Sequence, residues 1–414
     1  MKKILQIIKP GKEECAKFNS ITASFLKKLK FEGADIILGG SGAKDTWLSG
    51  NHDVDIFVRF NYEKYSHLSH ELADLLEKIL KQTFPKKEIK KLHGSRDYFQ
   101  LVYKNLNFEV VPILEIKHAK EAMNITDISP LHSVWINKNA KGIKDEIRLA
   151  KQFCRANKLY GAESYLSGFS GYILEILVTH YGSFEKLLKA SQKWKLKEVL
   201  DPEKHYKNKE MVMFHLNNSK LLSPLIIVDP VDKDRNAAAA LSKDKFLQFK
   251  NLAKLYLKEP MIEFFEPKEI VYKELKIGKG RNYLVFLDIE TLSGKEDVIG
   301  VKLLKVFNFL SKELSRFKIK DADWDWDHES KAKFYFILRK KKLSEYEIRK
   351  GPPLNLKDYA KDFKKKNKDT YVEKDCLMAK VKNNKPLLKD YLKSVVKKEY
   401  FKERIKKIAK MVVI

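Results

Sequence analysis

Two aspartates, Asp53 and Asp55, flank a valine at the start of an apolar run that ends at Phe60. Residues two apart on a strand share a face, so both carboxylates would point the same way while Val54 enters a core. Neighbouring carboxylates repel each other unless a cation lies between them, and hard oxygen ligands suit Mg²⁺. The pair therefore predicts a magnesium site on one face of a strand.

A glycine-rich turn precedes the aspartates, and Asp53 comes twelve positions after Ser41. Residues 39–42 read GGSG, which lets a backbone approach a phosphate closely, while Ser41 and Thr46 offer hydroxyls near an expected helix start. Lys44 adds a positive charge. Either half alone is a weak signal, because most Asp-x-Asp pairs are solvated loop residues. Together, between two apolar strands, they predict a nucleotide site.

This order of strand, turn, helix start and strand resembles the nucleotidyltransferases of the DNA polymerase beta-like superfamily, whose signature continues with a third carboxylate on a later strand. Residues 98–103 and 107–113 are predicted to form a hairpin through residues 104–106. Alternation sets Glu109 on the face opposite Phe108. Glu109 is therefore the predicted third ligand, although the superfamily more often carries Asp there. The alternative interpretation is an exposed strand glutamate.

Length and charge narrow the class of protein. A chain of 414 residues is too long for one ordinary core and predicts two to four domains. Lys and Arg number 83 against 55 Asp and Glu, a formal charge of +28, and a positive field of that size attracts polyanions. The alternative explanation is a surface that serves solubility.

Cysteine usage and hydropathy indicate the compartment. Cys15, Cys154 and Cys376 are odd in number and far apart, with no paired spacing for zinc or disulfides, which predicts a reducing cytoplasm. No run approaches about 18 apolar residues, and the first residues, MKKILQIIKPGKEE, have too short an apolar core for a signal peptide. We therefore expect a cytoplasmic protein with no membrane segment.

Two longer blocks narrow the resemblance. GAESYLSGFSGYILEIL, at residues 161–177, and VDPVDKDRNAAAALS, at residues 228–242, are similar to the archaeal-type, class I CCA-adding enzymes. The likeness covers about residues 36 to 267, with the blocks in the family's order. It implies Mg²⁺ as cofactor, CTP and ATP as substrates, tRNA as partner, and addition of C, C and A without a nucleic-acid template.

The resemblance also assigns individual residues. The family's triphosphate-holding positions match Ser41, Lys44, Ser129, His132, Lys151 and Tyr160, and its nucleotide-reading arginine matches Arg235. Lys44 stands where the family often has Arg. A triphosphate gripped by Lys151, with Tyr160 on a neighbouring helix, agrees with the charge of the ligand. Without the family, His132 is more often a helix residue near a cap and Tyr160 a core aromatic.

The order of periodic segments predicts an α+β chain. Residues 11–30 and 68–80 have the spacing of amphipathic helices that pack under the strands. Residues 1–128 are predicted to form a polymerase-beta-like palm domain with a mixed sheet, and residues 129–258 a helical central nucleotide-binding domain. Residues 259–414 are predicted to form an α/β region whose body and Lys-rich tail, from Lys361 onward, bind tRNA. For any individual tail lysine, a solvated charged helix is the better explanation.

Local signals refine the central domain. Ser129 is predicted to cap the first central helix, with Pro130 at the first helical position. The three aspartates in residues 229–234 lack the glycine and terminal glutamate of a calcium loop. They are predicted instead to orient Arg235 or to cap a helix that begins near Asn236.

The implied reaction is in-line attack of the tRNA 3′-hydroxyl on the α-phosphate of a nucleotide, with pyrophosphate leaving. Asp53 and Asp55 would hold two Mg²⁺ ions and Glu109 the one beside the hydroxyl. The alternatives are another RNA 3′-terminal nucleotidyltransferase, such as a poly(A) polymerase, and a non-catalytic RNA-binding protein. The intact carboxylates favour an enzyme, and the basic C-terminal half favours RNA over a small acceptor. The oligomeric state is left open, a homodimer included.

Overall fold

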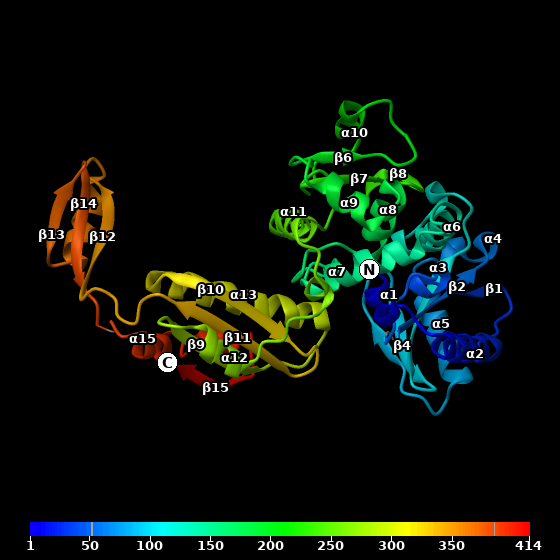
Figure 1. The fold of residues 1–414 in the computed structure, drawn as a ribbon, viewed down its shortest axis with the longest axis horizontal. Helices are drawn as coiled ribbons and strands as arrows, with labels where there is room; N and C mark the ends of the chain where they lie inside the picture. Colours follow the sequence, from blue (N-terminus) through cyan, green and yellow to red (C-terminus); the bar gives the residue numbers. More distant parts are fainter. Residues whose placement is uncertain (51–52, 385) are drawn as a thin grey trace. The chain divides into compact units, whose positions relative to one another are not determined.

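The computed structural model describes residues 1–50, 53–384 and 386–414, so Asn51 and His52, in the polar crossing before Asp53, lie outside the described residues. Its contacts divide the chain into two compact units, Met1–Lys268 and Glu269–Ile414 (Figure 1). Each unit is described by itself. The predicted boundary between residues 128 and 129 falls within the first unit and remains a prediction.

The first unit contains a five-stranded sheet in the order β1-β2-β5-β4-β3. The strands are β1 (Ala34–Leu38), β2 (Asp53–Phe60), β3 (Lys90–Leu92), β4 (Tyr98–Tyr103) and β5 (Leu106–Leu114). β2 and β5 are parallel and the other neighbours antiparallel, which confirms the predicted mixed sheet. The β4–β5 turn contains two residues, Lys104 and Asn105, both with positive φ (48° and 66°), so the predicted third turn residue, Leu106, belongs to the strand.

One face of this sheet is covered by α2 (Lys12–Lys28) and α5 (Leu72–Thr83), as Figure 1 shows. Val54 and Phe108 point into that core, and Phe25 of α2 stacks on Phe108 with ring centroids 4.0 Å apart. Strand alternation then sends Asp53 and its alternate neighbours to the opposite face. α5 starts four residues later than predicted, because Ser66–Leu68 forms a separate 3₁₀ turn.

A second core joins the central helices. It is built from α1 (Lys2–Ile8), α6 (Ser129–Asn139), α7 (Lys144–Ala156), α8 (Gly171–Tyr181), α9 (Phe184–Ser191) and α11 (Lys243–Lys258). A three-stranded sheet, β6 (Glu198–Leu200), β7 (Leu225–Asp229) and β8 (Asp232–Asn236), accompanies them, with α10 (Lys209–His215) between β6 and β7. The region predicted as helical is therefore helical with an added small sheet.

Two predicted helix starts in this region are wrong. Ser129 does not cap α6: the preceding 3₁₀ turn already has helical backbone at Ile128, and the capping side chain lies upstream at Asn124, which accepts from Thr126 N at 3.0 Å. Asn236 ends a strand rather than preceding a helix. The next helix begins at Lys243 behind a Ser242 cap.

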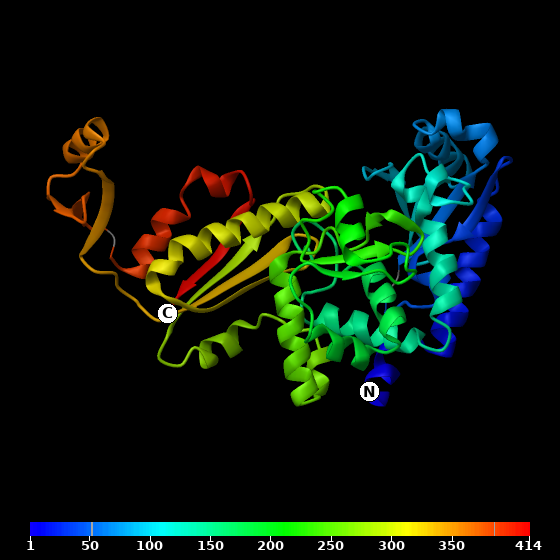
Figure 2. The same ribbon diagram turned by 90° about the horizontal axis from the view of Figure 1, so that it is seen from above.

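The second unit has a four-stranded antiparallel sheet in the order β10-β11-β9-β15. Its strands are β9 (Tyr283–Glu290), β10 (Ile319–Trp326), β11 (Lys331–Leu338) and β15 (Lys407–Val413), with helices α12 (Tyr272–Gly278), α13 (Glu296–Leu314), α15 (Leu388–Val395) and α16 (Glu399–Lys402). Figure 2 shows α13 lying along the sheet, and Phe307 of α13 stacks on Phe336 of β11 at 5.2 Å.

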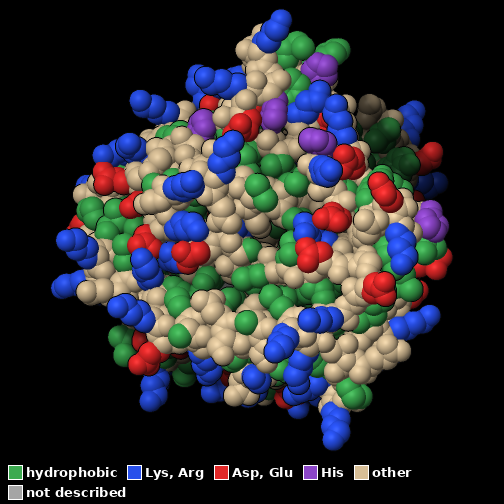
Figure 3. Space-filling view, turned by 90° about the vertical axis from the view of Figure 1, so that its right-hand side faces the viewer, with side chains coloured by type: hydrophobic (Ala, Val, Ile, Leu, Met, Phe, Trp, Pro, Cys, Tyr) green, Lys and Arg blue, Asp and Glu red, His purple; other side chains and the backbone are tan. Residues whose placement is uncertain are grey.

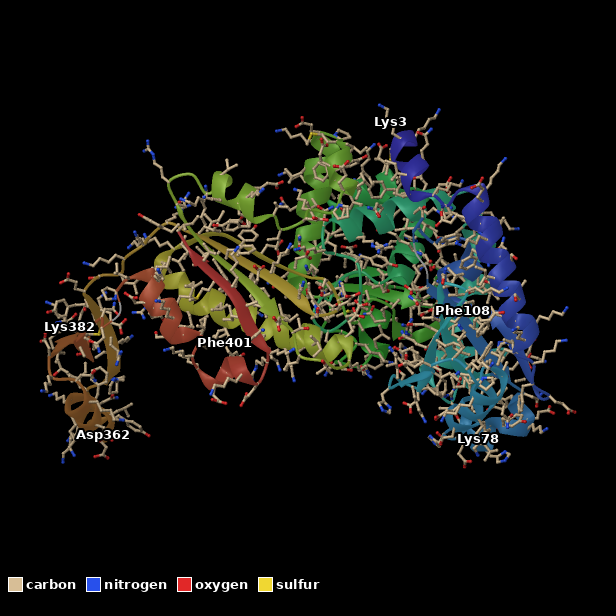
Figure 4. All side chains as sticks on the ribbon, turned by 90° about the horizontal axis from the view of Figure 1, so that it is seen from below. Lys3, Lys78, Phe108, Asp362, Lys382 and Phe401 are labelled. Atoms are coloured by element: carbon tan, nitrogen blue, oxygen red, sulfur yellow. The ribbon has the colours of Figure 1, made fainter. Side chains whose placement is uncertain are left out.

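Residues 346–382 contain a separate small sheet. Its strands are β12 (Tyr346–Pro353), β13 (Thr370–Glu373) and β14 (Cys376–Lys382), with helix α14 (Lys357–Lys366). The central strand is β14. Figure 4 marks Asp362 on α14 and Lys382 at the end of β14. The residues from Lys361 onward, predicted as a Lys-rich tail, thus divide between this small sheet and the four-stranded sheet to which β15 belongs.

Surface composition follows the net charge. On the face shown in Figure 3, Lys and Arg side chains are spread over the surface with acidic side chains among them. Among the described residues, no helix is both long enough and apolar enough to span a bilayer.

Candidate active site

Asp53 and Asp55 lie on the palm-sheet face opposite α2 and α5. Asp53 is exposed and Asp55 is half-buried at the start of β2. The parallel register of β2 on β5 sets Asp55 beside Glu109 and Asp53 beside Asn107, whose Nδ2 donates to Asp53 Oδ1 at 3.4 Å. Alternation along both strands therefore places the three predicted carboxylates on one sheet face.

The glycine turn is shaped by Asp55. Gly40 has φ +53°, and a Cβ at this position would lie 1.6 Å from Asp55 Oδ2. The turn is tied to the same residue through its backbone, because Gly39 N donates to Asp55 O at 2.7 Å. A side chain at position 40 would therefore displace the second carboxylate, which explains the glycine in physical terms.

The electrostatics of Asp55 suit a cation. Burial raises the pKa of Asp55, the Asp53 carboxylate adds to the rise, and the ammonium groups of Lys44 and Lys151 oppose it. A carboxylate in this state gains from a cation beside it, and paired aspartate oxygens fit a divalent ion. Within the described ranges, no three Asp, Glu, His or Cys side chains are already grouped around one ion position.

Glu109 is hydrogen-bonded to the neighbouring strand. It is half-buried, and Gln100 Nε2 of β4 donates to its Oε1 at 2.5 Å. β4 flanks β5 on the side away from β2. The Glu109 carboxylate thus has a hydrogen bond on the far side from Asp55, although the two residues are in register, and its role as third ligand remains a prediction.

A second cluster joins the turn to the central helices. Glu175 of α8 is fully buried, and its carboxylate accepts from Lys44 Nζ at 2.6 Å, Lys151 Nζ at 2.7 Å and Thr46 Oγ1 at 2.6 Å. Lys151 Nζ also donates to Thr46 Oγ1 at 2.9 Å and to its carbonyl oxygen at 3.2 Å. α8 therefore holds two cations, one from α3 (Gly40–Lys44) and one from α7, in one place.

The charges of this cluster compensate one another. Burial alone would raise the pKa of Glu175, but Lys151 and Lys44 outweigh it and lower the pKa to about 2. Burial lowers the pKa of Lys151, which Glu175 opposes. Thr46 was predicted to offer its hydroxyl to a phosphate. It is instead fully buried, and its hydroxyl donates to the Glu175 carboxylate.

A third cluster surrounds Asp229 at the end of β7. This fully buried carboxylate accepts from Arg235, from Tyr172 Oη at 3.0 Å and from Val231 N at 3.0 Å. His132 Nε2 lies 3.2 Å from Asp229 Oδ2, and the His132 ring stacks on that of Tyr172 with centroids 4.0 Å apart. The prediction that an aspartate orients Arg235 is confirmed.

Burial also shapes the pKa values around Asp229. It would raise that of Asp229 itself, but His132 and Arg235 outweigh it and lower the pKa to about 2. Burial lowers the pKa of His132 despite Asp229. Asp229 is thus an anion at neutral pH, and the imidazole of His132 is favoured in its neutral form.

Tyr160 lies beside Lys151, but not on a helix as predicted. It forms an isolated bridge with Phe169 after α7 ends. A Cβ at Gly171 would lie 2.9 Å from the Tyr160 hydroxyl and 3.6 Å from Lys151 Cε, so both side chains reach the start of α8. Burial raises the pKa of Tyr160, which keeps its hydroxyl a donor.

The two predicted serines occupy separate elements. Ser41 is half-buried in α3, where its carbonyl oxygen accepts from Thr46 N at 3.1 Å. Ser129 opens α6, one turn before His132. α3 and α6 are in contact, and Asn137 Nδ2 donates to Ala43 O at 3.0 Å. Their contacts with a nucleotide remain predictions.

Two residues of these clusters were not predicted. Glu175 and Tyr172 are three positions apart on α8, so both lie on one helix face. The available signal was a single Glu within the apolar run YILEILV, because a charge at such a position needs a buried partner. Sequence alone does not identify that partner.

Comparisons with known proteins agree with this geometry. Two family profiles match the first unit: "Nucleotidyltransferase domain" at residues 21–132, and "tRNA nucleotidyltransferase, second domain" at residues 145–266. The protein Cid1, in a solved structure whose title names RNA terminal uridylyl transferase activity, aligns at TM-score 0.50 and 14% identity. That alignment covers 65% of this chain and 97% of the Cid1 chain, and the likeness concerns the fold.

Curated relatives extend over both units. A CCA-adding enzyme of Pyrococcus abyssi is 31% identical over 415 residues, which cover 97% of this chain and 90% of the relative. One of Nanoarchaeum equitans is 41% identical over 283 residues, 67% of each chain. One of Methanosarcina mazei is 30% identical over 377 residues, 88% of this chain and 80% of the relative.

Proposed function

Because the chain belongs to the family of CCA-adding enzymes, we propose that it adds C, C and A to the 3′ end of tRNA, with CTP and ATP as substrates and Mg²⁺ as cofactor. It is a nucleotidyltransferase that works without a nucleic-acid template and releases pyrophosphate. The observation that carries the proposal is the register of β2 on β5, with three carboxylates on one sheet face.

The carboxylates serve the attacking end of the reaction. Asp53 and Asp55 would hold Mg²⁺, and Glu109 would be the third ligand. When bound, Mg²⁺ lowers the pKa of the attacking hydroxyl and offsets charge on the phosphates. The raised pKa of Asp55 supports this role, since a nearby cation stabilises its charged form.

The cation cluster serves the triphosphate. Lys44 and Lys151 face several negative charges on the nucleotide, with Tyr160 beside Lys151 as a hydroxyl donor. In the structure Lys151 Nζ donates to Glu175 Oε1, to Thr46 Oγ1 and, at the longest distance of 3.2 Å, to Thr46 O. A phosphate oxygen would replace the bond to Thr46 O, and the bonds to Glu175 and to the Thr46 hydroxyl would remain. Ser41, Ser129 and His132 complete the set by the family resemblance.

Arg235 reads the nucleotide. Its guanidinium is fixed by the Asp229 carboxylate and lies 6.0 Å from the centroid of the Tyr172 ring. A planar guanidinium offers donors in a fixed geometry, and cytosine and adenine both present acceptors to such a group. On the Watson–Crick edge, cytosine N3 and adenine N1 accept a hydrogen bond, whereas uracil N3 and guanine N1 carry a hydrogen. Donors directed at that ring nitrogen would therefore favour C and A over U and G.

tRNA is the acceptor. The formal charge of +28 supports binding of a polyanion, and the second unit with its Lys-rich tail supplies much of the surface for it. We place the protein in the cytoplasm because its three cysteines show no paired spacing. A homodimer is left open.

The test uses tRNA transcripts that lack CCA, end in C, or end in CC, incubated with labelled CTP and ATP. Sequencing of the 3′ ends is expected to show completion to CCA from each transcript and then arrest. A long run of A would identify a poly(A) polymerase instead. Tight tRNA binding with no incorporation would identify a non-catalytic RNA-binding protein.

A further inference from the structure

Glu175 is an acidic residue at the centre of a basic site. It lies on α8, which is apolar around it, and it is fully buried. Its two carboxylate oxygens accept three hydrogen bonds at 2.6 to 2.7 Å, from Lys44, Lys151 and Thr46. These three donors come from the turn region and from α7, so the carboxylate joins separate segments of the chain.

The two lysines depend on this carboxylate. Lys151 is 3% exposed and Lys44 is 8% exposed, and two ammonium groups held together in a buried place repel each other. Glu175 bonds one lysine through each oxygen, Lys44 at Oε2 and Lys151 at Oε1. One negative charge against two positive charges leaves a net positive cluster whose geometry is set before any ligand arrives.

We propose that Glu175 is a positioning residue for the nucleotide triphosphate, which holds Lys44 and Lys151 together as a preformed phosphate-binding unit. The inference rests on the proposed function, which assigns both lysines to the triphosphate. Fixing donors in the bound geometry reduces the entropy lost on binding, so the pair binds phosphate more tightly with Glu175 than without it. Glu175 itself does not touch the nucleotide.

A role in charge neutralisation alone predicts the opposite sign. Removing an anion from a basic site raises the local positive potential, which would tighten phosphate binding. A role in folding alone predicts lower stability with unchanged binding by the folded protein. The direction of the affinity change therefore separates the three roles.

The experiment measures binding of inorganic tripolyphosphate, with Mg²⁺, to the full chain by calorimetry. Glu175→Gln keeps the size of the side chain, but its amide accepts from one lysine and presents N–H groups to the other. We expect about tenfold weaker tripolyphosphate binding, about 1.4 kcal/mol, a matching rise in KM for CTP, and unchanged tRNA affinity. Unchanged or tighter tripolyphosphate binding would overturn the proposal.

A double-mutant cycle tests whether Glu175 acts through a lysine. In a Lys44→Met background, Glu175→Gln is expected to have much less effect on tripolyphosphate binding, because the pair is already broken. Equal effects in both backgrounds would overturn the positioning role. Thr179→Val is the matched control, because its hydroxyl donates at 2.7 Å to the backbone carbonyl oxygen of Glu175, on the same helix, rather than to the carboxylate.

A second variant covers the case in which Glu175→Gln does not fold. Thr46→Val removes a donor to Glu175 and an acceptor for Lys151 without a change of charge. We expect about threefold weaker tripolyphosphate binding, and unchanged binding would overturn the proposal. Tripolyphosphate binding needs no tRNA, so failure of CCA addition in the transcript assay would leave this result separate from the proposed function.

Discussion

Carboxylates in the palm sheet and among the central helices have pKa values shifted in opposite directions. Glu175 and Asp229, in the central region, are fully buried, yet their pKa values lie at about 2 because cations of the protein surround them. Asp55, on the sheet, has its pKa raised by burial and by Asp53. The first two are satisfied within the fold, whereas the charge of Asp55 is compensated least by the chain itself. Carboxylates of one chemical type thus divide into structural anchors, whose charge is compensated within the fold, and the class to which Asp55 belongs, which we propose as ligands for an added cation.

The largest expected effect comes from changing Asp55, the proposed cation ligand. Asp55→Asn keeps the shape but removes the charge, so nucleotide addition should fall by about a thousandfold or more, about 4 kcal/mol. tRNA affinity should stay nearly constant because other residues supply it. Single-turnover CTP addition at saturating tRNA measures the loss.

Asp35→Asn is the control for that variant. Asp35 lies on β1 of the same sheet and pairs with Arg59 rather than with the carboxylate group. Its activity should match that of the unmodified protein. Near-normal turnover by Asp55→Asn would remove Asp55 from the ligand class.

Glu109 tests whether the ligand class has a third member. Glu109→Ala should slow the chemical step by about a hundredfold, about 3 kcal/mol, because it removes one oxygen ligand. Glu109→Asp should retain part of the rate. Glu115, which lies 3.7 Å from Arg59, is the matched control. If Glu115→Ala loses CTP addition in the single-turnover assay while Glu109→Ala keeps the rate of the unmodified protein, the third carboxylate has been assigned wrongly.

Glu175, one of the two structural anchors, is expected to make the stability of the protein depend on pH. The pKa of Glu175 in the folded protein lies below the ordinary glutamate value of 4.5. Its contribution to stability is therefore present above about pH 4.5 and is lost as the pH falls toward about 2. The Glu175→Gln variant lacks this pH-dependent contribution to stability. The difference in unfolding free energy between the two proteins should shrink by about 2 kcal/mol between pH 6 and pH 3.

Urea unfolding followed by circular dichroism at each pH measures that difference. Subtracting the variant curve cancels the similar contribution of Asp229, which both proteins share. A difference that stays constant with pH would show that Glu175 is not held as an anion.

The smallest expected effect concerns the anchor at Asp229. Arg235→Ala should weaken incorporation of both CTP and ATP by about tenfold and loosen discrimination against UTP and GTP, because the fixed donors are lost. Misincorporation assays with each nucleotide alone measure the discrimination. Selectivity that does not change would make Arg235 a structural partner of Asp229.

Periodic segments could be predicted well from the sequence. Residues 11–30, 98–103 and 107–113 carry strong helix or strand patterns, and they fold as α2, β4 and β5 within one or two residues. The small sheet of β6, β7 and β8 was missed because its strands have three to five residues, too few for periodicity to show. Its last strand, DKDRN, is also almost entirely polar.

In the candidate site, too, residues with a local sequence pattern could be predicted, and residues that only the fold brings together could not. Residues with a spacing of their own, such as Asp53 and Asp55, could be predicted, and so could the shared face with Glu109. Glu175 could not be assigned, because its partners Lys44 and Lys151 are 131 and 24 positions away and only the fold brings them together. Helix starts failed where a 3₁₀ turn replaced a side-chain cap, as before Ser129.

The contact between Gly40 and Asp55 has an evolutionary consequence. A first methyl group at position 40 would overlap the Asp55 carboxylate, and the positive φ there disfavours other residues even when position 55 shrinks. A lineage that lost catalysis would therefore be freed at position 55 before position 40. In a diverging descendant, a larger residue at position 40 would date the loss of the second aspartate to an earlier step, whereas a retained glycine would be explained by the positive φ alone.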